Sequence, residues 1–403
     1  MMKYLPIPIA LLEVGKPLPV DVLSDAGQLL LRAGQPITSE QHRDKLHAFK
    51  ACTHLADGLA WQRAYERMIH QMLQNGADVR ELARASMPSE ILESDYLNPQ
   101  LQNGGWLDVQ EVLRGILYQG GLAINPLARL KGLEEKVLSL LQQDGDASLF
   151  ALFQALTDNR LGYCATHALL CAVVCELTAT KLGLPGPQRK PLIAAALTMN
   201  IGMARDQDRM ASQATAINDW QRVLVAEHAA RSEEMLRALG VVDAAQLDLV
   251  RWHHEPDAPL GLPANQTARR LLHLADVFVA RTAARGTRSA QSPVAAVKSM
   301  VFGGGAELGL GSAMAQAVGF YPPGSYVKLV NGEIAVAVQR GERANTPWVI
   351  SIVGNDAMPL FRYQCKSTAE PREAIAAAVN FESIKVAVSA EKVQKARERI
   401  PKA

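Results

Sequence analysis

The feature that most constrains this 403-residue chain is an almost unbroken run of helical periodicity from about residue 147 to 320. Apolar residues recur there three and four positions apart, which is typical of helices that bury one face. Helices that follow one another without strands between them can bury those faces only against each other. The pattern therefore predicts a mainly α helical bundle, with helices at 147–157, 160–182, 188–204, 218–239, 243–254, 266–285, 292–301 and 311–319.

The segment before this bundle divides into two parts. Residues 1–58 alternate short β-prone runs with turn signals at 25–27 and 34–36, which predicts a small β-containing N-terminal domain. Residues 59–146 have helical spacing broken by Pro, Asn and Gly, which indicates a helical connecting region. The helical run 106–143 could pack against a second copy to give a homodimer, and packing within one chain explains it equally well.

After the bundle, residues 321–403 are expected to form a β-rich extension. Two β-prone runs, 325–330 and 333–340, are joined by Asn331-Gly332, which is a strong signal for a β-hairpin. From Pro371 onward the pattern predicts an alanine-rich helix and a charged tail. The sequence thus predicts four domains, at 1–58, 59–146, 147–320 and 321–403.

Charge, hydropathy and cysteine content exclude several classes of protein. Lys and Arg number 42 against 40 Asp and Glu, so the net charge is +2 and no basic stripe is present for nucleic acid. The apolar stretches fall short of the ~18 residues that span a bilayer, and the proline-bearing N-terminal segment is a poor signal peptide. Five cysteines form no regular disulfide framework, which is typical of reduced thiols. We therefore expect a cytoplasmic protein without nucleic-acid or membrane partners.

Histidines in the helical block are the candidate functional residues. Imidazoles on separate helices, together with a carboxylate, are suitable ligands for a buried divalent ion. The residues concerned are His167, His228, His253, His254, His273 and Asp276. A single buried histidine is more often a hydrogen-bonded core residue, but the adjacent pair His253-His254 favours a site.

A second pattern lies beside His167. Cys164, Cys171 and Cys175 fall with it on one stripe of a predicted helix. A thiolate beside an imidazole is a combination that binds zinc, although small buried cysteines more often pack in a core. Both interpretations stay open at this point.

Four segments, taken in order, resemble a degenerate HD-GYP domain: LTMNIGM, VAEHAARSEEML, VRWHHEPDAPLGLP and ADVFVARTAARGTRSAQSP. The resemblance covers roughly residues 150–320. The segment YPPGSYVKLVNGEIAVAV is similar to the tail that follows such domains, and GQLLLRAGQPITSEQ is similar to a segment at their start. The family is an all-helical branch of the HD phosphohydrolases. Its members hydrolyse the bacterial messenger cyclic di-GMP with two or three metal ions, usually iron or manganese.

The resemblance implies metal ligands residue by residue. The implied ligands are His167, His228, His253, His254 and Asp276. Glu255 completes the family's HHE triplet. The namesake His-Asp pair, however, corresponds to Met199-Asn200, and the lysine that follows it corresponds to Met203. No catalytic position of that motif is therefore intact.

Some of the positions that bind the dinucleotide in the family have the same residue in this sequence. Gly261 and Pro263 match two residues of the GYP tripeptide, whose tyrosine is Leu262 here. Arg285 and Arg288 match the segment that grips the dinucleotide in the family. The resemblance therefore implies ligand-binding roles for these two arginines and for the glycine and proline of the tripeptide.

The substitutions at 199 and 200 change the metal chemistry. In the family the aspartate bridges two ions, and such a centre activates a water and stabilises the attacking and leaving oxygens. Asn200 offers only a neutral carbonyl oxygen, and the thioether of Met199 has little affinity for hard ions. By this reasoning His167 and Asp276 are too few to hold an ion, whereas the other three histidines could hold one. His273, one helical turn before Asp276, could supply an imidazole in place of the lost one.

These observations favour a bacterial cyclic di-GMP-related signalling protein, a pseudo-enzyme that no longer hydrolyses and acts by binding. Its partner would be cyclic di-GMP or a signalling protein such as a diguanylate cyclase. The alternative is a metal-dependent cyclic di-GMP phosphodiesterase with a residual site on His228, His253 and His254. A third hypothesis is a scaffold in which the histidines satisfy core hydrogen bonds. The expected cofactor is one divalent ion, iron, manganese or zinc, with a metal-free protein left open.

Overall fold

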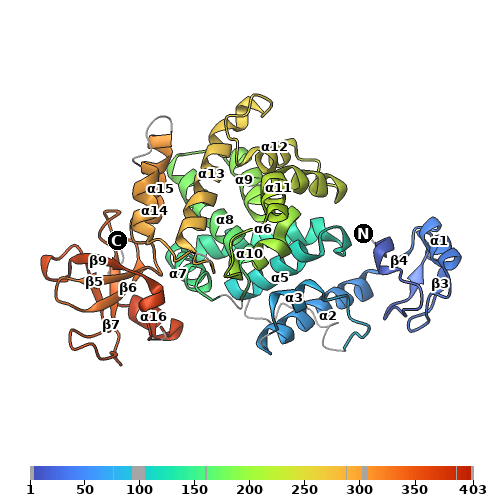
Figure 1. The fold of residues 1–403 in the computed structure, drawn as a ribbon, viewed down its shortest axis with the longest axis horizontal. Coiled ribbons are helices and arrows are strands. Elements are labelled where there is room, and N and C mark those ends of the chain that lie inside the picture. Colours follow the sequence, from blue (N-terminus) through green and yellow to red (C-terminus); the bar gives the residue numbers. More distant parts are fainter. Residues whose placement is uncertain are drawn as a thin grey trace. The chain divides into compact units, whose positions relative to one another are not determined.

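The computed structural model describes residues 4–75, 77–92, 105–158, 161–286, 288–301, 307–386 and 388–400 (Figure 1). Its contacts divide the chain into two compact units. Unit 1 comprises residues 1–133 and 234–241, and unit 2 comprises residues 134–233 and 242–403. The four-domain division is finer than these units and stays a prediction.

Unit 1 begins with a small antiparallel sheet in the strand order β1-β4-β2-β3. Its strands are β1 (Tyr4–Pro6), β2 (Val22–Leu23), β3 (Leu29–Leu31) and β4 (Cys52–His54). Strands this short need other elements to bury their apolar face, and they pack in one cluster with Trp61 and Ile124. Ser39 caps the intervening helix α1 (Glu40–Ala48) by accepting a hydrogen bond from the His42 N–H.

The helices of unit 1 include a buried ion pair. They are α2 (Leu55–Gln74), α3 (Val79–Ala83), α5 (Trp106–Gln119) and the first part of α6 (Pro126–Gln143). Arg129 of α6 pairs with Glu66 of α2. Burial raises the pKa of Glu66 and lowers the pKa of Arg129, although each charge opposes that shift in its partner. Neither residue is well solvated, so each depends on the other.

Unit 2 is a helical bundle with a β-rich extension, and the chain has the mainly α fold class predicted from the sequence. Its helices are α7 (Gly145–Ala155), α8 (Tyr163–Lys181), α9 (Gly186–Thr198), α10 (Ala204–Ser212), α11 (Asp219–Ala238), α12 (Ala244–Trp252), α13 (Gln266–Thr282), α14 (Pro293–Val301) and α15 (Glu307–Val318). The last turn of α11, from residue 234, belongs to unit 1. The predicted helix 188–204 is too long, because the chain leaves helical geometry at Asn200 (φ −106°, ψ 11°). The next helix, α10, is absent from the sequence prediction.

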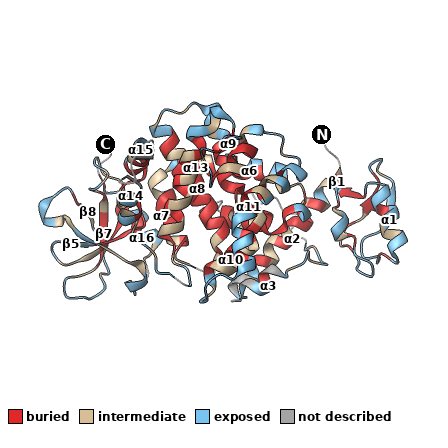
Figure 2. Ribbon diagram, turned by 45° about the horizontal axis from the view of Figure 1, so that its top comes forward, coloured by how far each residue is buried: buried red, intermediate tan, exposed pale blue. Residues whose placement is uncertain are grey.

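Helix α8 is the central element of this bundle. It packs against α7, α9, α10, α13 and α15, and it is buried over most of its length (Figure 2). An 18-residue window within its 19 residues has a mean hydropathy of 1.4, so by length and composition the helix could cross a bilayer, contrary to the expectation that every apolar stretch is too short. However, 78% of that window is buried inside the protein, as in the core helix of a bundle.

The extension is a five-stranded antiparallel sheet in the order β8-β7-β6-β5-β9. Its strands are β5 (Tyr326–Leu329), β6 (Ile334–Gln339), β7 (Trp348–Val353), β8 (Cys365–Ser367) and β9 (Ile375–Val379). The predicted hairpin joins β5 and β6, with Tyr326 opposite Val336. Its turn contains Gly332 at φ +90°, a conformation that glycine adopts without a steric penalty.

The alanine-rich helix predicted after Pro371 is wrong. Residues Ile375–Val379 form β9, which pairs antiparallel with β5. Alanine favours a helix in isolation, but the open edge of β5 offers unpaired backbone groups that this segment satisfies. The two sheets also mean that the chain as a whole is not all-α, unlike the family that the sequence resembles.

Helix α16 (Ala390–Arg397), which lies in the predicted charged tail, covers one face of this sheet. Its Val393 packs in one cluster with β6, β7 and Phe150 of α7. Arg397 donates a 3.0 Å hydrogen bond to Asp144, the residue that caps α7. The extension is therefore attached to the bundle by apolar packing and by an ion pair.

Candidate metal centre

Three histidines bring their ring nitrogens together in the bundle. His228 comes from the middle of α11, and His253 and His254 follow directly after α12. The Nε2 atom of His228 lies 3.2 Å from Nε2 of His253 and 3.2 Å from Nε2 of His254. His228 and His253 are fully buried, whereas His254 is exposed at the rim.

The hydrogen bonds behind these rings determine which nitrogens are free. Nδ1 of His228 lies 2.6 Å from the carbonyl oxygen of Val225, and Nδ1 of His253 lies 2.8 Å from that of Val250. A carbonyl only accepts, so each Nδ1 carries the proton and each neutral ring has a bare lone pair on Nε2. Burial lowers the pKa of His228 to about 4 and the pKa of His253 to about 3, so both rings are neutral near pH 7.

Two lone pairs that face each other at 3.2 Å repel unless a cation lies between them. Imidazole nitrogens bound at about 2.0–2.1 Å to one tetrahedral ion are separated by about 3.3–3.4 Å. The observed separation is close to that value. The three-histidine cluster therefore fits a divalent ion in both charge and geometry.

A second cluster joins α8 to α13. Nε2 of His167 lies 2.8 Å from Oδ1 of Asp276 and 3.5 Å from Sγ of Cys171. His167 and Cys171 are fully buried, and the Asp276 side chain is 13% exposed. Burial would raise the pKa of Asp276, but the hydrogen bond from His167 and the nearby imidazoles hold it well below its usual range. Burial raises the pKa of the Cys171 thiol well above its usual value.

Tyr163 connects this second cluster to a surface arginine. Its hydroxyl lies 2.9 Å from Nδ1 of His167 and accepts a 3.1 Å hydrogen bond from Nη2 of Arg285. The guanidinium also lies over the Tyr163 ring, 5.4 Å from its centroid. Burial raises the pKa of Tyr163 to about 12, although the charge of Arg285 opposes that shift. The hydroxyl is therefore protonated near neutral pH and can both accept and donate.

The residues at the lost motif are buried. Met199 is fully buried, and Asn200 and Met203 are 4% and 8% exposed. The Nδ2 atom of Asn200 has no hydrogen-bond partner among the described residues. His273 belongs to neither cluster, and its Nδ1 lies 2.9 Å from the backbone oxygen of His253. Its role as a replacement ligand has no support from this placement.

The tripeptide Gly261-Leu262-Pro263 is held by a buried ion pair. Arg269 of α13 donates to Asp248 of α12 at 2.8 Å and to the Leu262 carbonyl at 2.9 Å. Asp248 also accepts a 2.7 Å hydrogen bond from the Leu262 N–H. A Cβ at Gly261 would lie 2.5 Å from Cζ of Arg269, so glycine is required where the guanidinium passes. Leu262 itself is 42% exposed.

The two predicted phosphate-binding arginines are paired across a tight turn. Arg285 and Arg288 exchange backbone hydrogen bonds of 2.9 Å in both directions. Both residues are exposed, and Nη2 of Arg288 donates to the carbonyl of Ala280. The N–H of Gly286 donates to the carbonyl of Ala211, which fixes the turn against α10. The Arg285 guanidinium therefore reaches Tyr163, whereas that of Arg288 reaches the backbone of α13.

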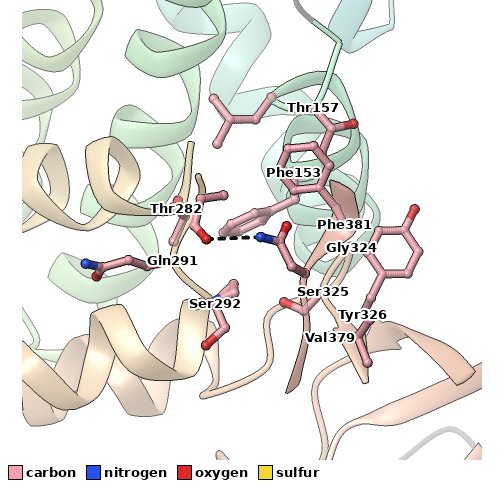
Figure 3. A pocket seen from close by; sticks show the side chains of 14 residues that line it. Phe153, Thr157, Thr282, Gln291, Ser292, Gly324, Ser325, Tyr326, Val379 and Phe381 are labelled. Atoms are coloured by element: carbon pink, nitrogen blue, oxygen red, sulfur yellow. Dashed lines mark hydrogen bonds between the residues drawn. The ribbon is translucent and has the colours of Figure 1, made fainter. Parts of the chain in front are cut away.

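A cavity between the bundle and the extension lies apart from these clusters (Figure 3). Phe153, Thr282, Ser325 and Tyr326 are among the residues around it. Its volume is about 40 Å³, room for about three water molecules. The lining residues that the structure describes carry no charged side chain, so this cavity is a poor site for a phosphate ligand.

The structure brings the predicted metal ligands into two groups. His228, His253 and His254 form one, and His167 and Asp276 lie in the other. Sequence reasoning missed the proximity of Cys171 to Asp276 and the role of Arg269 behind the tripeptide. The four-residue spacing of His167 and Cys171 could have indicated that Cys171 lies near the metal ligands. No signal in the sequence distinguishes Arg269 from an arginine on the surface of a helix.

Comparisons with known proteins identify the family that the helical bundle resembles. The profile of the HD-domain family matches residues 152–308, which confirms the HD-domain resemblance found in the sequence. The cyclic di-GMP phosphodiesterase PA4108 of Pseudomonas aeruginosa is 28% identical over 210 residues. That alignment covers 50% of each protein, so the chain spans about half the length of this relative.

One solved structure is a more distant likeness. It is Bd1817, an HDG"Y"P protein of Bdellovibrio bacteriovorus, with 15% identity and a TM-score of 0.39. The superposition covers 77% of this chain and 98% of that one. At that score the likeness carries no argument about the site.

Proposed function

Since residues 152–308 place this chain among the HD-domain proteins, we propose that it is a bacterial cyclic di-GMP-related signalling protein that binds without hydrolysing. The contrast between the two parts of its metal centre carries the proposal. Three imidazole nitrogens converge as ligands for one ion, whereas the bridging position holds the neutral Asn200 beside the buried Met199. A single ion that no carboxylate bridges to a second ion can still bind a phosphate group.

The chain's own residues account for binding. His228, His253 and His254 would hold one divalent ion, iron, manganese or zinc, which supplies positive charge to a bound phosphate. Arg285 and Arg288 are exposed and can donate charge-assisted hydrogen bonds to phosphate oxygens. The Tyr163 hydroxyl holds the Arg285 guanidinium in place.

Hydrolysis should be negligible for a physical reason. A two-ion centre stabilises the attacking and the leaving oxygen of a phosphodiester together, and no bridging carboxylate stands at position 200. Loss of one preorganised stabilising group in an active site typically costs about 2.7–4 kcal/mol, or about 100- to 1,000-fold in rate. We expect a loss at least this large here.

The test compares the wild type with a Met199→His, Asn200→Asp, Met203→Lys triple variant, both loaded with manganese or iron. Cyclic di-GMP turnover that appears only in the triple variant supports the proposal. Turnover by the wild type at a rate typical of enzymes would refute it. That outcome would favour the alternative, a phosphodiesterase that uses one ion on the three-histidine cluster.

Metal content provides an independent test of the three-histidine cluster. His253→Ala removes a fully buried ring whose Nε2 faces His228 at 3.2 Å, so the variant should lose one equivalent of bound ion. His273→Ala is the matched control, because His273 is a histidine of the same bundle that belongs to neither cluster. Unchanged metal content in His253→Ala would contradict the assignment.

The location and the partners of the protein are also proposed. We place the protein in the cytoplasm, with cyclic di-GMP or a signalling protein such as a diguanylate cyclase as its partner. A homodimer through residues 106–143 belongs to the same proposal. Sedimentation at a series of concentrations, and co-purification with a diguanylate cyclase with and without cyclic di-GMP, test these two points.

A further inference from the structure

We propose that Cys171 replaces the imidazole lost at position 199, and that His167, Cys171 and Asp276 bind a second ion of the zinc class. The inference goes beyond the proposed function, because it concerns an ion that the three-histidine cluster does not hold. It assigns a role to the Cys171 thiol, for which the family resemblance gives none.

The separation of the sulfur and nitrogen atoms fits such an ion. A tetrahedral zinc bound at about 2.3 Å to sulfur and about 2.0–2.1 Å to nitrogen separates those two ligands by about 3.5–3.6 Å. The Sγ of Cys171 lies 3.5 Å from Nε2 of His167. A carboxylate oxygen of Asp276 completes a set of three atoms that all lie within 4.8 Å of one another. It lies 2.8 Å from Nε2 of His167 as a hydrogen-bond acceptor, and it would move outward by about 0.5 Å to share an ion with that nitrogen.

Packing of two helices holds these ligands in position. His167 and Cys171 lie one turn apart on α8, so their side chains project from the same face. Asp276 approaches from α13, which packs directly against α8. All three side chains are buried or nearly so, which excludes most of the water that would compete for the ion.

Tyr163 allows His167 to act as a ligand. Without an ion, Nε2–H of His167 donates to Asp276 at 2.8 Å and Nδ1 accepts from the Tyr163 hydroxyl at 2.9 Å. When an ion occupies Nε2, the ring proton resides on Nδ1 and is donated to the same hydroxyl oxygen. Each ion bound also displaces the thiol proton of Cys171, so one proton is released to solvent per ion.

The donor set determines the class of ion. Thiolate and imidazole favour zinc and its analogues cobalt and cadmium, whereas manganese and magnesium favour oxygen donors. A centre with this thiol should therefore select a different ion from the iron or manganese that the family resemblance implies. The neighbouring Cys175 lies one turn farther along α8 and belongs to neither cluster, so it serves as a matched control.

The experiment titrates the metal-stripped full-length chain with cobalt(II) and follows the ultraviolet absorption that cobalt–thiolate bonds produce. The wild type should show this absorption, and Cys171→Ser should lose it together with one equivalent of bound metal. Cys175→Ser should retain both. Cys171→Val keeps the buried volume and should behave as Cys171→Ser does, with circular dichroism confirming that each variant folds.

Three outcomes would overturn the inference. They are no cobalt–thiolate absorption in the wild type at saturating cobalt, the same absorption in both Cys171 variants, or its loss in Cys175→Ser. His253→Ala separates the inference from the proposed function, because it should lose the other equivalent and keep the thiolate absorption. Failure of the second ion therefore leaves the three-histidine cluster and the hydrolysis assay untouched.

Discussion

Replacing Gly261 by alanine should disrupt the tripeptide by displacing Arg269. The added Cβ would lie 2.5 Å from Cζ and 2.8 Å from Nη2 of that guanidinium, well inside van der Waals contact. Gly261 has no positive φ, so its backbone conformation tolerates alanine and the side-chain clash is the whole cost. The guanidinium cannot swing away freely, because it donates to Asp248, to the Leu262 carbonyl and to the Pro256 carbonyl at 2.8–2.9 Å.

The magnitude follows from what Arg269 neutralises. Asp248 and Arg269 are 8% and 2% exposed, and removal of one partner from a buried ion pair costs about 3–5 kcal/mol. Gly261→Ala moves the guanidinium without removing it, so we expect a loss of about 2–4 kcal/mol in the free energy of unfolding, bounded by the cost of Arg269→Ala.

A double-mutant cycle in equilibrium urea unfolding, followed by circular dichroism, tests this reasoning. In an Arg269→Ala background the clash is absent, so Gly261→Ala should cost little and the coupling energy should be about 2 kcal/mol. Gly309→Ala is the control, because among the described residues no heavy atom beyond its own helix backbone and chain neighbours lies within 4 Å of the added methyl, and alanine is favoured inside a helix. Additive costs of the two substitutions would refute the reasoning.

Three other perturbations have definite expectations. In urea unfolding, Asp144→Ala should lose about 1 kcal/mol more of the free energy of unfolding than Asp144→Ser does. Both variants lose the ion pair with Arg397, but serine can still cap α7, so equal losses would contradict the cap. Burial would raise the pKa of Asp144, but hydrogen bonds from Arg397 and the α7 backbone lower it, so its stabilisation is complete above about pH 4 and is lost as the pH falls through the folded-state pKa. Asp144→Asn should make the free energy of unfolding depend less on pH in the acid range, and an unchanged pH dependence would contradict this assignment. Arg129→Met should destabilise unit 1 by about 3–5 kcal/mol by removing the ion-pair partner of the buried Glu66, and adding Glu66→Gln should recover part of that loss in the same assay.

The sequence predicts those elements of the fold that depend on local pattern. The helices around His167, His228 and Asp276 follow from apolar periodicity, and the hairpin at Asn331-Gly332 follows from turn chemistry. Strand β9 could not be predicted in this way, because its alanines favour a helix and only the edge of β5 makes them a strand.

The candidate site, like the fold, can be predicted only in part from the sequence. Individual ligand residues can be named from the sequence, since their types and order match a family pattern. Their grouping depends on how helices pack: Asp276 is 109 positions from His167, and no local rule joins it to Cys171. The hydrogen bonds that orient His228 and His253 use backbone carbonyls of the same helices, which the side-chain pattern does not encode.

The covering of the C-terminal sheet by α16 has a consequence for biosynthesis. The apolar face formed by Val336, Val338, Ile350 and Ile352 emerges from the ribosome before Val393 and its neighbours can shield it. At roughly 5–20 residues per second, the nascent sheet stays uncovered for a few seconds, during which exposed strands are prone to aggregate. Slower emergence of α16 from the ribosome should therefore lower the soluble yield.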